Sequence, residues 1–590
     1  MKKILQTILL SLLSVQLAFA LPFDQIIGDD AELYFSIRSL SEIRETLDEH
    51  PISDVFEDEV LIEYFEAISN GSGDDNESDL GFFEEMEDVF GLTEDEFFEL
   101  FPGQVCLAIY NLSGQILGEK SSPELVIAAE FSAGAERLNE LLQIQFERNA
   151  KSQKEVNPLV EHEMIEETFM GETLYFDETF NGEETYIEDG YALVDGIFVL
   201  ATPESRLREV VQAIKEGSDS AISETEPYLE SREFAGRGDV SCYVNLVEIM
   251  PSVAASLGQL PELGSLALVG ITPDSLRDAL SLESIQALFM SMDLVEDGLL
   301  CDYGFLYSEK AGLLSLLEYV EGELPEARYV PSNVLNTSLT LFDLSAMYAN
   351  LEEVLDAASP ALLPMMDARL QNLQADTGID LREAVLNNFG THIVSYSVME
   401  EDILDDSGFP RPQQVFALEV KDTAAFSQAI GALVDSSPRL KSFIEESVFE
   451  GETIYTFKTP SAPSSGGTEF SYTITRSRFI LAMGHISLLH SLLSKLDKTS
   501  DGFWQDSEVD LMFERIERPN VVTRSYYDFE QIIEPFFEFL LNMSASHNFP
   551  ESLASGEIPD SLKGSYRMFS EGNQTPFGLL GRTLIVKSKE

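Results

Sequence analysis

The sequence has 590 residues, with 105 acidic against 36 basic side chains and a formal charge of −69. Such a charge repels phosphate groups, which argues against nucleic acid and anionic membranes as partners. Because 44% of the residues are hydrophobic and 10% aromatic, the chain can form packed cores, and we expect a folded protein with a hydrated acidic surface. Dissolved cations are expected partners as screening ions that weaken the self-repulsion.

Residues 1–20 have the pattern of a secretory signal peptide. Lys2 and Lys3 precede a mostly apolar stretch, and Ala18-Phe19-Ala20 has the small residues of a cleavage site. We expect cleavage near Ala20 and export to the periplasm or the extracellular space, with a formal charge of −71 once both lysines are removed. A retained membrane anchor is the alternative, but the apolar stretch is short for a span of about 20 residues.

An acidic segment at 69–81 is the best candidate for a metal site. Asp74, Asn76, Ser78 and Glu85 occupy positions 1, 3, 5 and 12 of a twelve-residue calcium loop. The match is imperfect because position 6 is Asp79, where the loop needs a turn glycine. A solvated acidic loop is therefore the competing interpretation. Calcium is the only candidate cofactor, and otherwise we expect none.

The three cysteines are odd in number and widely spaced. Cys106 and Cys242 lie in strand-like segments, which favours burial as small apolar side chains. The alternative is one disulfide between two of the three cysteines, Cys106, Cys242 and Cys301, with the third left as a free thiol.

A nearly identical phrase occurs twice, as FMGETLY at 169–175 and FEGETIY at 449–455. Five further pairs of similar segments keep the same order along the chain, which predicts a tandem duplication. Their first members begin at 35, 91, 126, 197 and 298 and their second members at 339, 378, 415, 478 and 578. The predicted domains are the signal peptide at 1–20, a first repeat at 21–325 and a second repeat at 326–590.

Two polar inserts, near 69–81 and 148–163, distinguish the first repeat and are expected to be surface loops. A turn glycine between a helix and a strand would explain the repeated phrase as framework. A binding motif used twice is the other interpretation, since both copies keep Glu and Thr.

Short alternating strands and amphipathic helices follow one another in each repeat. In the second repeat we expect strands at 415–420, 452–457, 470–475, 478–483, 521–528, 565–569 and 583–588, and helices at 423–434, 487–496 and 529–543. Small polar residues between a strand and a helix are predicted to cap the helices, namely Ser39, Asn245, Asp343, Asp422 and Asp528. The expected fold class is α+β, in two tandem copies of a mixed, mainly antiparallel sheet with helices on one face.

Motifs of known chemistry are missing from the sequence: it has no G-x-S-x-G, H-E-x-x-H, P-loop or G-x-G-x-x-G. His162 between two glutamates is a weak metal candidate in the second insert. The triplet Arg237-Gly238-Asp239 matches a cell-adhesion tripeptide, but so short a match arises by chance. The sequence therefore nominates no catalytic residue.

The chain resembles a family of uncharacterised exported bacterial proteins that carry a domain of unknown function. The resemblance rests on GDDAELYFSIRSLSEI, ALEVKDTAAF and RFILAMGHISLLHSLL. It implies export and a repeated α+β unit, and it carries over no site residue.

Two functions remain open. The first is a non-enzymatic binding or scaffold protein whose partner is an unknown small molecule or protein. The second is a hydrolase that uses paired carboxylates with or without a cation, for which two buried carboxyls about 5–10 Å apart would be needed. Stabilisation by calcium at the acidic insert is a third, weaker interpretation.

Overall fold

A computed structural model describes thirteen stretches of the chain: 21–48, 50–53, 92–116, 123–132, 134–157, 159–180, 184–257, 270–399, 412–457, 470–496, 498, 502–533 and 566–587. By its internal contacts the chain divides into two compact units. Unit 1 consists of Met1–Glu42 and Leu80–Ile249, and unit 2 of Ile43–Asp79 and Met250–Glu590. The predicted repeats, 21–325 and 326–590, describe similarity within the sequence, which this division does not test.

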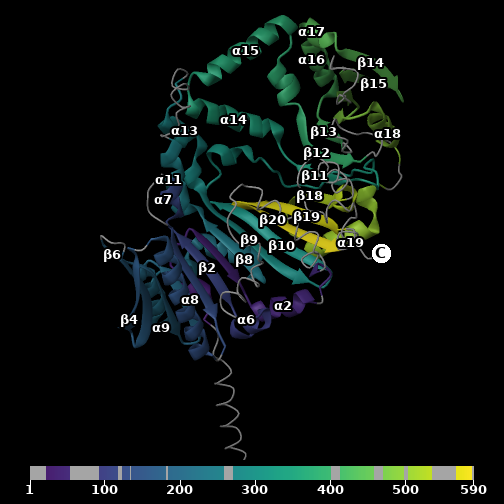
Figure 1. The fold of residues 1–590 in the computed structure, drawn as a ribbon. Helices are drawn as coiled ribbons and strands as arrows, with labels where there is room; N and C mark the ends of the chain where they lie inside the picture. Colours follow the sequence, from purple (N-terminus) through teal and green to yellow (C-terminus); the bar gives the residue numbers. More distant parts are fainter. Residues whose placement is uncertain are drawn as a thin grey trace, which may run out of the picture. The chain divides into compact units, whose positions relative to one another are not determined.

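Unit 1 contains an antiparallel sheet with the strand order β8-β1-β2-β3-β7-β6-β5-β4 (Figure 1). The strands, in chain order, are β1 (Leu33–Ile37), β2 (Val105–Tyr110), β3 (Glu124–Glu130), β4 (Glu161–Phe169), β5 (Glu172–Phe180), β6 (Thr185–Val194), β7 (Ile197–Thr202) and β8 (Val240–Asn245). Val, Ile, Leu and aromatic side chains alternate along β2, β3 and β7, as expected of strands that are covered by other elements.

Helices cover both faces of this sheet, so the prediction of helices on one face is wrong. Leu138 of α8 (Ala135–Val156) packs in one core with Tyr191 and Phe198. On the opposite face, Arg206 and Arg208 of α9 (Glu204–Glu216) lie over the rings of Tyr110 and Phe176. Both alternating sets of side chains in the central strands are apolar, and both therefore need a cover. The other helices are η1 (Phe23–Gln25), α6 (Glu94–Leu100), α7 (Leu112–Ile116), η2 (Ile222–Glu224) and α10 (Glu226–Ala235).

Two of the three unit boundaries, at 42/43 and 249/250, fall inside helices α2 (Leu40–Asp48) and α11 (Leu246–Leu257). The third, at 79/80, lies outside the described residues.

Unit 2 contains an antiparallel sheet with the order β9-β10-β20-β19-β18-β11-β12-β13-β17-β16-β15-β14. The strands are β9 (Ile285–Val295), β10 (Gly298–Tyr307), β11 (Asn336–Leu341), β12 (Phe389–Val398), β13 (Gln413–Val420), β14 (Ile444–Phe449), β15 (Glu452–Phe457), β16 (Phe470–Ile474), β17 (Arg478–Met483), β18 (Val521–Asp528), β19 (Tyr566–Thr575) and β20 (Gly578–Lys587). Figure 1 shows how the C-terminal strands β19 and β20, in yellow, lie beside β9 and β10, in teal. Both units combine antiparallel sheets with helices, so the fold class is α+β, as predicted.

Helices cover both faces of the second sheet as well. Leu488 of α18 (Ile486–Leu496) packs in the main core with Ile480. Phe426 of α16 (Thr423–Ser436) contacts Phe479, the neighbour of Ile480 in β17, which points to the other face. The remaining helices are α13 (Pro273–Leu280), η4 (Leu282–Ser284), η5 (Gly312–Leu316), α14 (Leu344–Ala358), α15 (Leu362–Thr377), η6 (Arg382–Leu386), α17 (Pro438–Lys441), η7 (Phe503–Gln505) and α19 (Ser507–Ile516).

The repeated phrase forms a β-hairpin turn in each unit. Phe169 pairs with Glu172, and Phe449 pairs with Glu452. The turn residues all have positive φ, at 54° and 88° for Met170 and Gly171, and 48° and 91° for Glu450 and Gly451. Two-residue hairpin loops of this kind match the twist of the flanking strands. This geometry agrees with the framework interpretation, but the predicted helix before the phrase is wrong, because a strand precedes it in both units.

Two further predictions concern local structure. The expected loop at 148–163 is wrong, because α8 runs to Val156 and β4 begins at Glu161. Asp343 and Asp422 cap their helices as predicted, each accepting two backbone N–H groups. Asn245 instead donates its side-chain amide to the carbonyl of Asp29, at 3.1 Å.

A buried ion pair lies where β10 meets β20. Asp302, 3% exposed, faces Arg582 in the register, and the guanidinium donates from Nε and Nη2 at 2.7 and 2.6 Å. Arg518 donates to the same carboxylate at 3.1 Å. Charge-assisted hydrogen bonds from both arginines satisfy the buried carboxylate of Asp302 and stabilise the pairing of β10 with β20.

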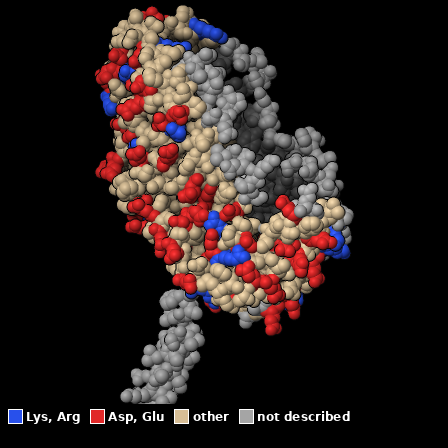
Figure 2. All heavy atoms as spheres, turned by 90° about the vertical axis from the view of Figure 1, so that its left-hand side faces the viewer, with Lys and Arg blue, Asp and Glu red and all other residues tan. Residues whose placement is uncertain are grey.

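Acidic side chains are spread over the described part of the face that Figure 2 shows, and basic ones are fewer and scattered among them. Within the described residues, no helix is both long and apolar enough to cross a membrane.

Candidate functional site

Two hollows in unit 1 are lined by the segment that precedes β1 and by residues of the 213–248 region. Their volumes are about 590 and 210 Å³. Phe23, Ile26 and Ile27 are buried and anchor the segment. An antiparallel bridge from Gly28 to Ala221 then joins it to the chain before η2.

The larger hollow is built around Asp24, whose carboxylate is almost completely buried at 3% exposed. Its Oδ2 accepts the Tyr228 hydroxyl at 3.0 Å and an N–H of Arg237 at 3.3 Å, and Arg232 Nη2 lies 3.8 Å away. Oδ1 accepts no hydrogen bond from the described residues. A buried carboxylate oxygen without a donor is costly, so among the described residues Oδ1 is an unsatisfied hydrogen-bond acceptor beside the hollow.

The two arginines are held at the end of α10. Arg232 is in its last turn, donates to the Gly236 carbonyl at 2.8 Å, and has a buried Nε without a partner among the described residues. Gly236 ends the helix with φ 71°, a conformation that suits glycine, and Arg237 follows it. The Arg237 side chain is 53% exposed. The hollow therefore holds a buried anionic group next to a half-exposed cationic one.

Apolar side chains complete the wall of the larger hollow. Leu229 is 53% exposed although it lies in a helix that buries Tyr228 beside it. Leu21, Ala213 and Ala221 also line the space. Burial raises the pKa of Tyr228, and Arg232 opposes that effect, so Tyr228 stays a neutral hydrogen-bond donor at physiological pH.

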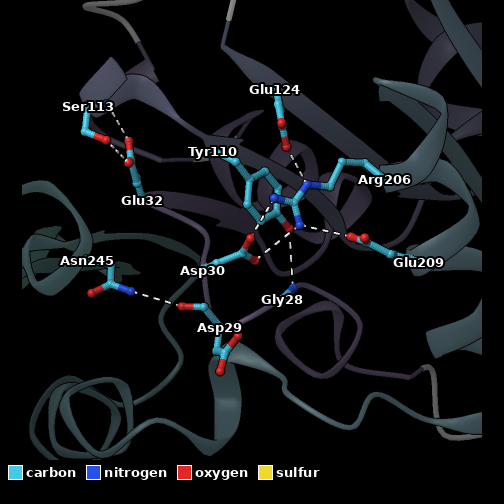
Figure 3. A network of polar contacts seen from close by, with 10 residues as sticks. All are labelled: Gly28, Asp29, Asp30, Glu32, Tyr110, Ser113, Glu124, Arg206, Glu209 and Asn245. Atoms are coloured by element: carbon cyan, nitrogen blue, oxygen red, sulfur yellow. Dashed lines mark hydrogen bonds and ion pairs between the residues drawn. The ribbon is translucent and has the colours of Figure 1, made fainter. Parts of the chain in front are cut away.

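Arg206 is the centre of a second polar network, drawn in Figure 3. Its guanidinium binds Asp30 at 2.6 Å, Glu124 at 2.7 Å and Glu209 at 2.9 Å, and lies 4.0 Å over the Tyr110 ring. Burial acts to lower the pKa of Arg206, but the hydrogen bonds that it donates to Asp30 and Glu124 outweigh burial and raise the pKa above its usual value. The three carboxylates lie in the segment before β1, in β3 and in α9, so Arg206 connects the segment before β1 to the sheet and to α9.

Two more contacts in Figure 3 hold the same segment. Glu32, 4% exposed, accepts the backbone N–H and the hydroxyl of Ser113 at 2.8 and 2.5 Å. Asn245 donates to the Asp29 carbonyl. Glu32 thus has a donor for each oxygen, in contrast to Asp24.

The smaller hollow has an acidic rim formed by Asp29, Asp30 and Glu248. Burial raises the pKa of Glu248, and the nearby carboxylates of Asp30, Glu32 and Asp29 add to the effect. All three rim residues are exposed, and Asp30 already binds Arg206. We regard this hollow as an acidic surface feature.

The predicted calcium ligands Asp74, Asn76, Ser78 and Glu85, and the signal peptide at 1–20, lie outside the described residues. In the stretches that the structure does describe, no group of three or more His, Cys, Asp and Glu side chains is arranged to hold a metal.

His162, the weak metal candidate, lies in β4 with its side chain 1% exposed. Its Nδ1 contacts Thr179 and Asp177 at 2.9 and 3.0 Å, and neither neighbouring glutamate is among these partners. In the triplet at 237–239, Arg237 binds Asp24 and Asp239 binds Arg38 at 2.5 Å. Both charges of the triplet thus have partners within the chain.

All three cysteines are free thiols. Cys106 is buried, as expected, and burial raises the pKa of its thiol to about 12. Cys242 and Cys301 are half-buried.

Sequence analysis did not find the larger hollow. Asp24, Tyr228, Arg232 and Arg237 are spread over more than 200 positions and follow no motif. The one signal in the sequence is the presence of two basic residues five positions apart in a chain where acidic residues outnumber basic ones by 105 to 36.

No family model matches the chain, and no curated protein matches it. One solved structure, of crystal form III of TP0453, aligns with 49% of this chain and 79% of its own at 10% identity and a TM-score of 0.23.

Proposed function

We propose that this chain is an exported, non-enzymatic binding protein, and that its ligand enters the larger hollow of unit 1. The observation that carries the proposal is Asp24, a buried carboxylate that lines this hollow with one oxygen lacking a donor. A volume of about 590 Å³ is within the range of roughly 300–1,000 Å³ that ligand pockets have. Membership of the exported family that the sequence resembles is part of this proposal.

A binding role accounts for the hollow better than carboxylate catalysis does. Paired-carboxylate hydrolysis needs two carboxyls that face one cleft. Of the carboxylates that line the two hollows, only Asp24 is buried, and it accepts hydrogen bonds from Tyr228 and Arg237. The carboxylates at the rim of the smaller hollow are exposed, and one of them, Asp30, already binds Arg206.

We also propose that the chain arose by tandem duplication. In support, the order β8-β1-β2-β3-β7-β6-β5-β4 of unit 1 recurs in unit 2 as β18-β11-β12-β13-β17-β16-β15-β14. The strand register also agrees between the two copies. Val126 pairs with Ala201 in the first, and the residues that correspond to them in the second, Val415 and Ala482, pair with each other. The polar site residues are not repeated, because Asp24 and Arg206 would correspond to Arg328 and Ser487, which suggests that only one copy keeps the site.

The experiment that tests the binding proposal is a thermal-shift screen of the mature chain, starting at Leu21, against a chemically diverse panel of small polar molecules. At least one compound should raise the unfolding midpoint, because a ligand that binds only the folded state stabilises it. The shift should be lost in Asp24→Asn and kept in Glu32→Gln, which alters a buried carboxylate with both oxygens satisfied. Shifts that survive Asp24→Asn would place binding elsewhere and contradict the proposal.

A further inference from the structure

The larger hollow offers opposite charges at two depths. Asp24 Oδ1 lacks a donor and is buried. Arg237 is half-exposed, and it contacts Asp24 through Nη2 of a guanidinium that has five N–H donors. A ligand that satisfies both groups needs a hydrogen-bond donor at one point and an acceptor close beside it.

Charge balance selects among the ligands that meet this requirement. A purely cationic ligand would bring a third positive charge next to Arg232 and Arg237. A purely anionic ligand would compete with Asp24 for the arginines and leave Oδ1 without a donor. A ligand that carries an ammonium and a carboxylate on the same carbon meets both needs, and charge-assisted hydrogen bonds of this kind are the strong ones.

Accordingly, we propose that the larger hollow binds a free α-amino acid with an apolar side chain, its ammonium on Asp24 and its carboxylate on Arg237. This rests on the proposed function and names its ligand class. The exposed Leu229 and the neighbouring Leu21 offer the apolar surface that such a side chain would cover. The smaller hollow has carboxylates at its rim and no arginine, so it lacks the second half of this recognition.

The test is a calorimetric titration of the mature chain with three related compounds. L-leucine has both charges, L-leucinamide has only the ammonium, and 4-methylpentanoate has only the carboxylate. Leucine should bind at least about tenfold more tightly than either analogue, the effect of one lost charge-assisted hydrogen bond. Arg237→Gln should make leucine and leucinamide bind alike, and Asp24→Asn should make leucine and 4-methylpentanoate bind alike.

Two controls match these variants. Arg137→Gln removes an arginine with 54% exposure, close to the 53% of Arg237, from the far α8 helix. Glu32→Gln alters a buried carboxylate that has no free oxygen. Leucine affinity should be unchanged in both. If Asp24→Asn does not fold, Arg237→Gln decides the matter, because that side chain lies at the surface.

The possible outcomes separate this proposal from the binding function. If either analogue binds as tightly as leucine, the zwitterion proposal is overturned. If leucine does not bind but a panel compound still depends on Asp24, the ligand class is wrong and the binding function stands. If neither leucine nor any panel compound binds, both proposals fail.

Discussion

At the residue scale, two carboxylates of unit 2 differ in burial and in their arginine partners. Asp302 is 3% exposed and accepts hydrogen bonds from Arg582 and Arg518. Asp297 is 31% exposed and accepts two hydrogen bonds from Arg515. Asp302→Asn should lower the free energy of unfolding by about 3 kcal/mol, because it leaves Arg582 without its buried partner. Asp297→Asn should cost less than about 1 kcal/mol, as exposed pairs do. Urea unfolding of both variants checks the difference, and equal losses would contradict it.

Glu248 gives a prediction of pH dependence. Its pKa is raised by burial and then by Asp30, so the folded state holds this proton more tightly than the unfolded state. The favourable contribution is complete below the unfolded pKa of about 4.3 and is lost as the pH rises through the folded pKa. Glu248→Gln should therefore gain stability relative to the wild type between pH 4 and pH 7.

The measurement for Glu248 is the urea midpoint of both proteins at the two pH values. In an Asp30→Asn background the difference should shrink, because the strongest nearby charge is gone. A difference that does not change with pH would refute the assignment.

At the element scale, the two hairpins that contain the repeated phrase should respond alike. Gly171 and Gly451 have φ of 88° and 91°, and open space surrounds the position of an added Cβ. Alanine at either site should cost about 1 kcal/mol, from backbone strain alone. Gly431 in helix α16 also has open space but no positive φ, so Gly431→Ala should gain about 0.5–1 kcal/mol. Chemical denaturation of the three variants tests this, and unequal losses at the two turns would contradict the shared role.

Elements that follow local rules could be predicted from the sequence. The strand at 478–483 and the helix near 487–496 were placed to within a residue, because alternation and leucine spacing signal them directly. Long-range choices could not be predicted. Polar residues in β4 favoured a loop, yet pairing with β5 makes this segment a strand. The hollow around Asp24 was missed because it joins side chains from three separate segments.

At the scale of the whole molecule, the acidic surface should make stability depend on salt. Self-repulsion among the acidic groups seen in Figure 2 opposes the compact state, and screening weakens it. Raising sodium chloride from about 20 to about 300 mM should raise the thermal midpoint, because the Debye length falls below about 10 Å.

Calcium provides the matched comparison for this prediction. At equal ionic strength and in the absence of a specific site, calcium chloride should act no more strongly than sodium chloride. A larger effect of millimolar calcium that Asp74→Ala removes would instead favour a calcium site in the acidic insert. A thermal midpoint that does not change with salt concentration would contradict the prediction that surface charge destabilises the folded state.

The central claim is that the larger hollow of unit 1 binds a ligand, and hydrogen–deuterium exchange with a stabilising compound tests it most directly. Bound ligand should slow exchange in the peptides that cover 21–27 and 217–237, which line the hollow. Peptides of unit 2 should be unchanged, since none of their residues lines it. Slower exchange only in unit 2, or in the acidic segment at 69–81, would contradict the claim and move the binding site there.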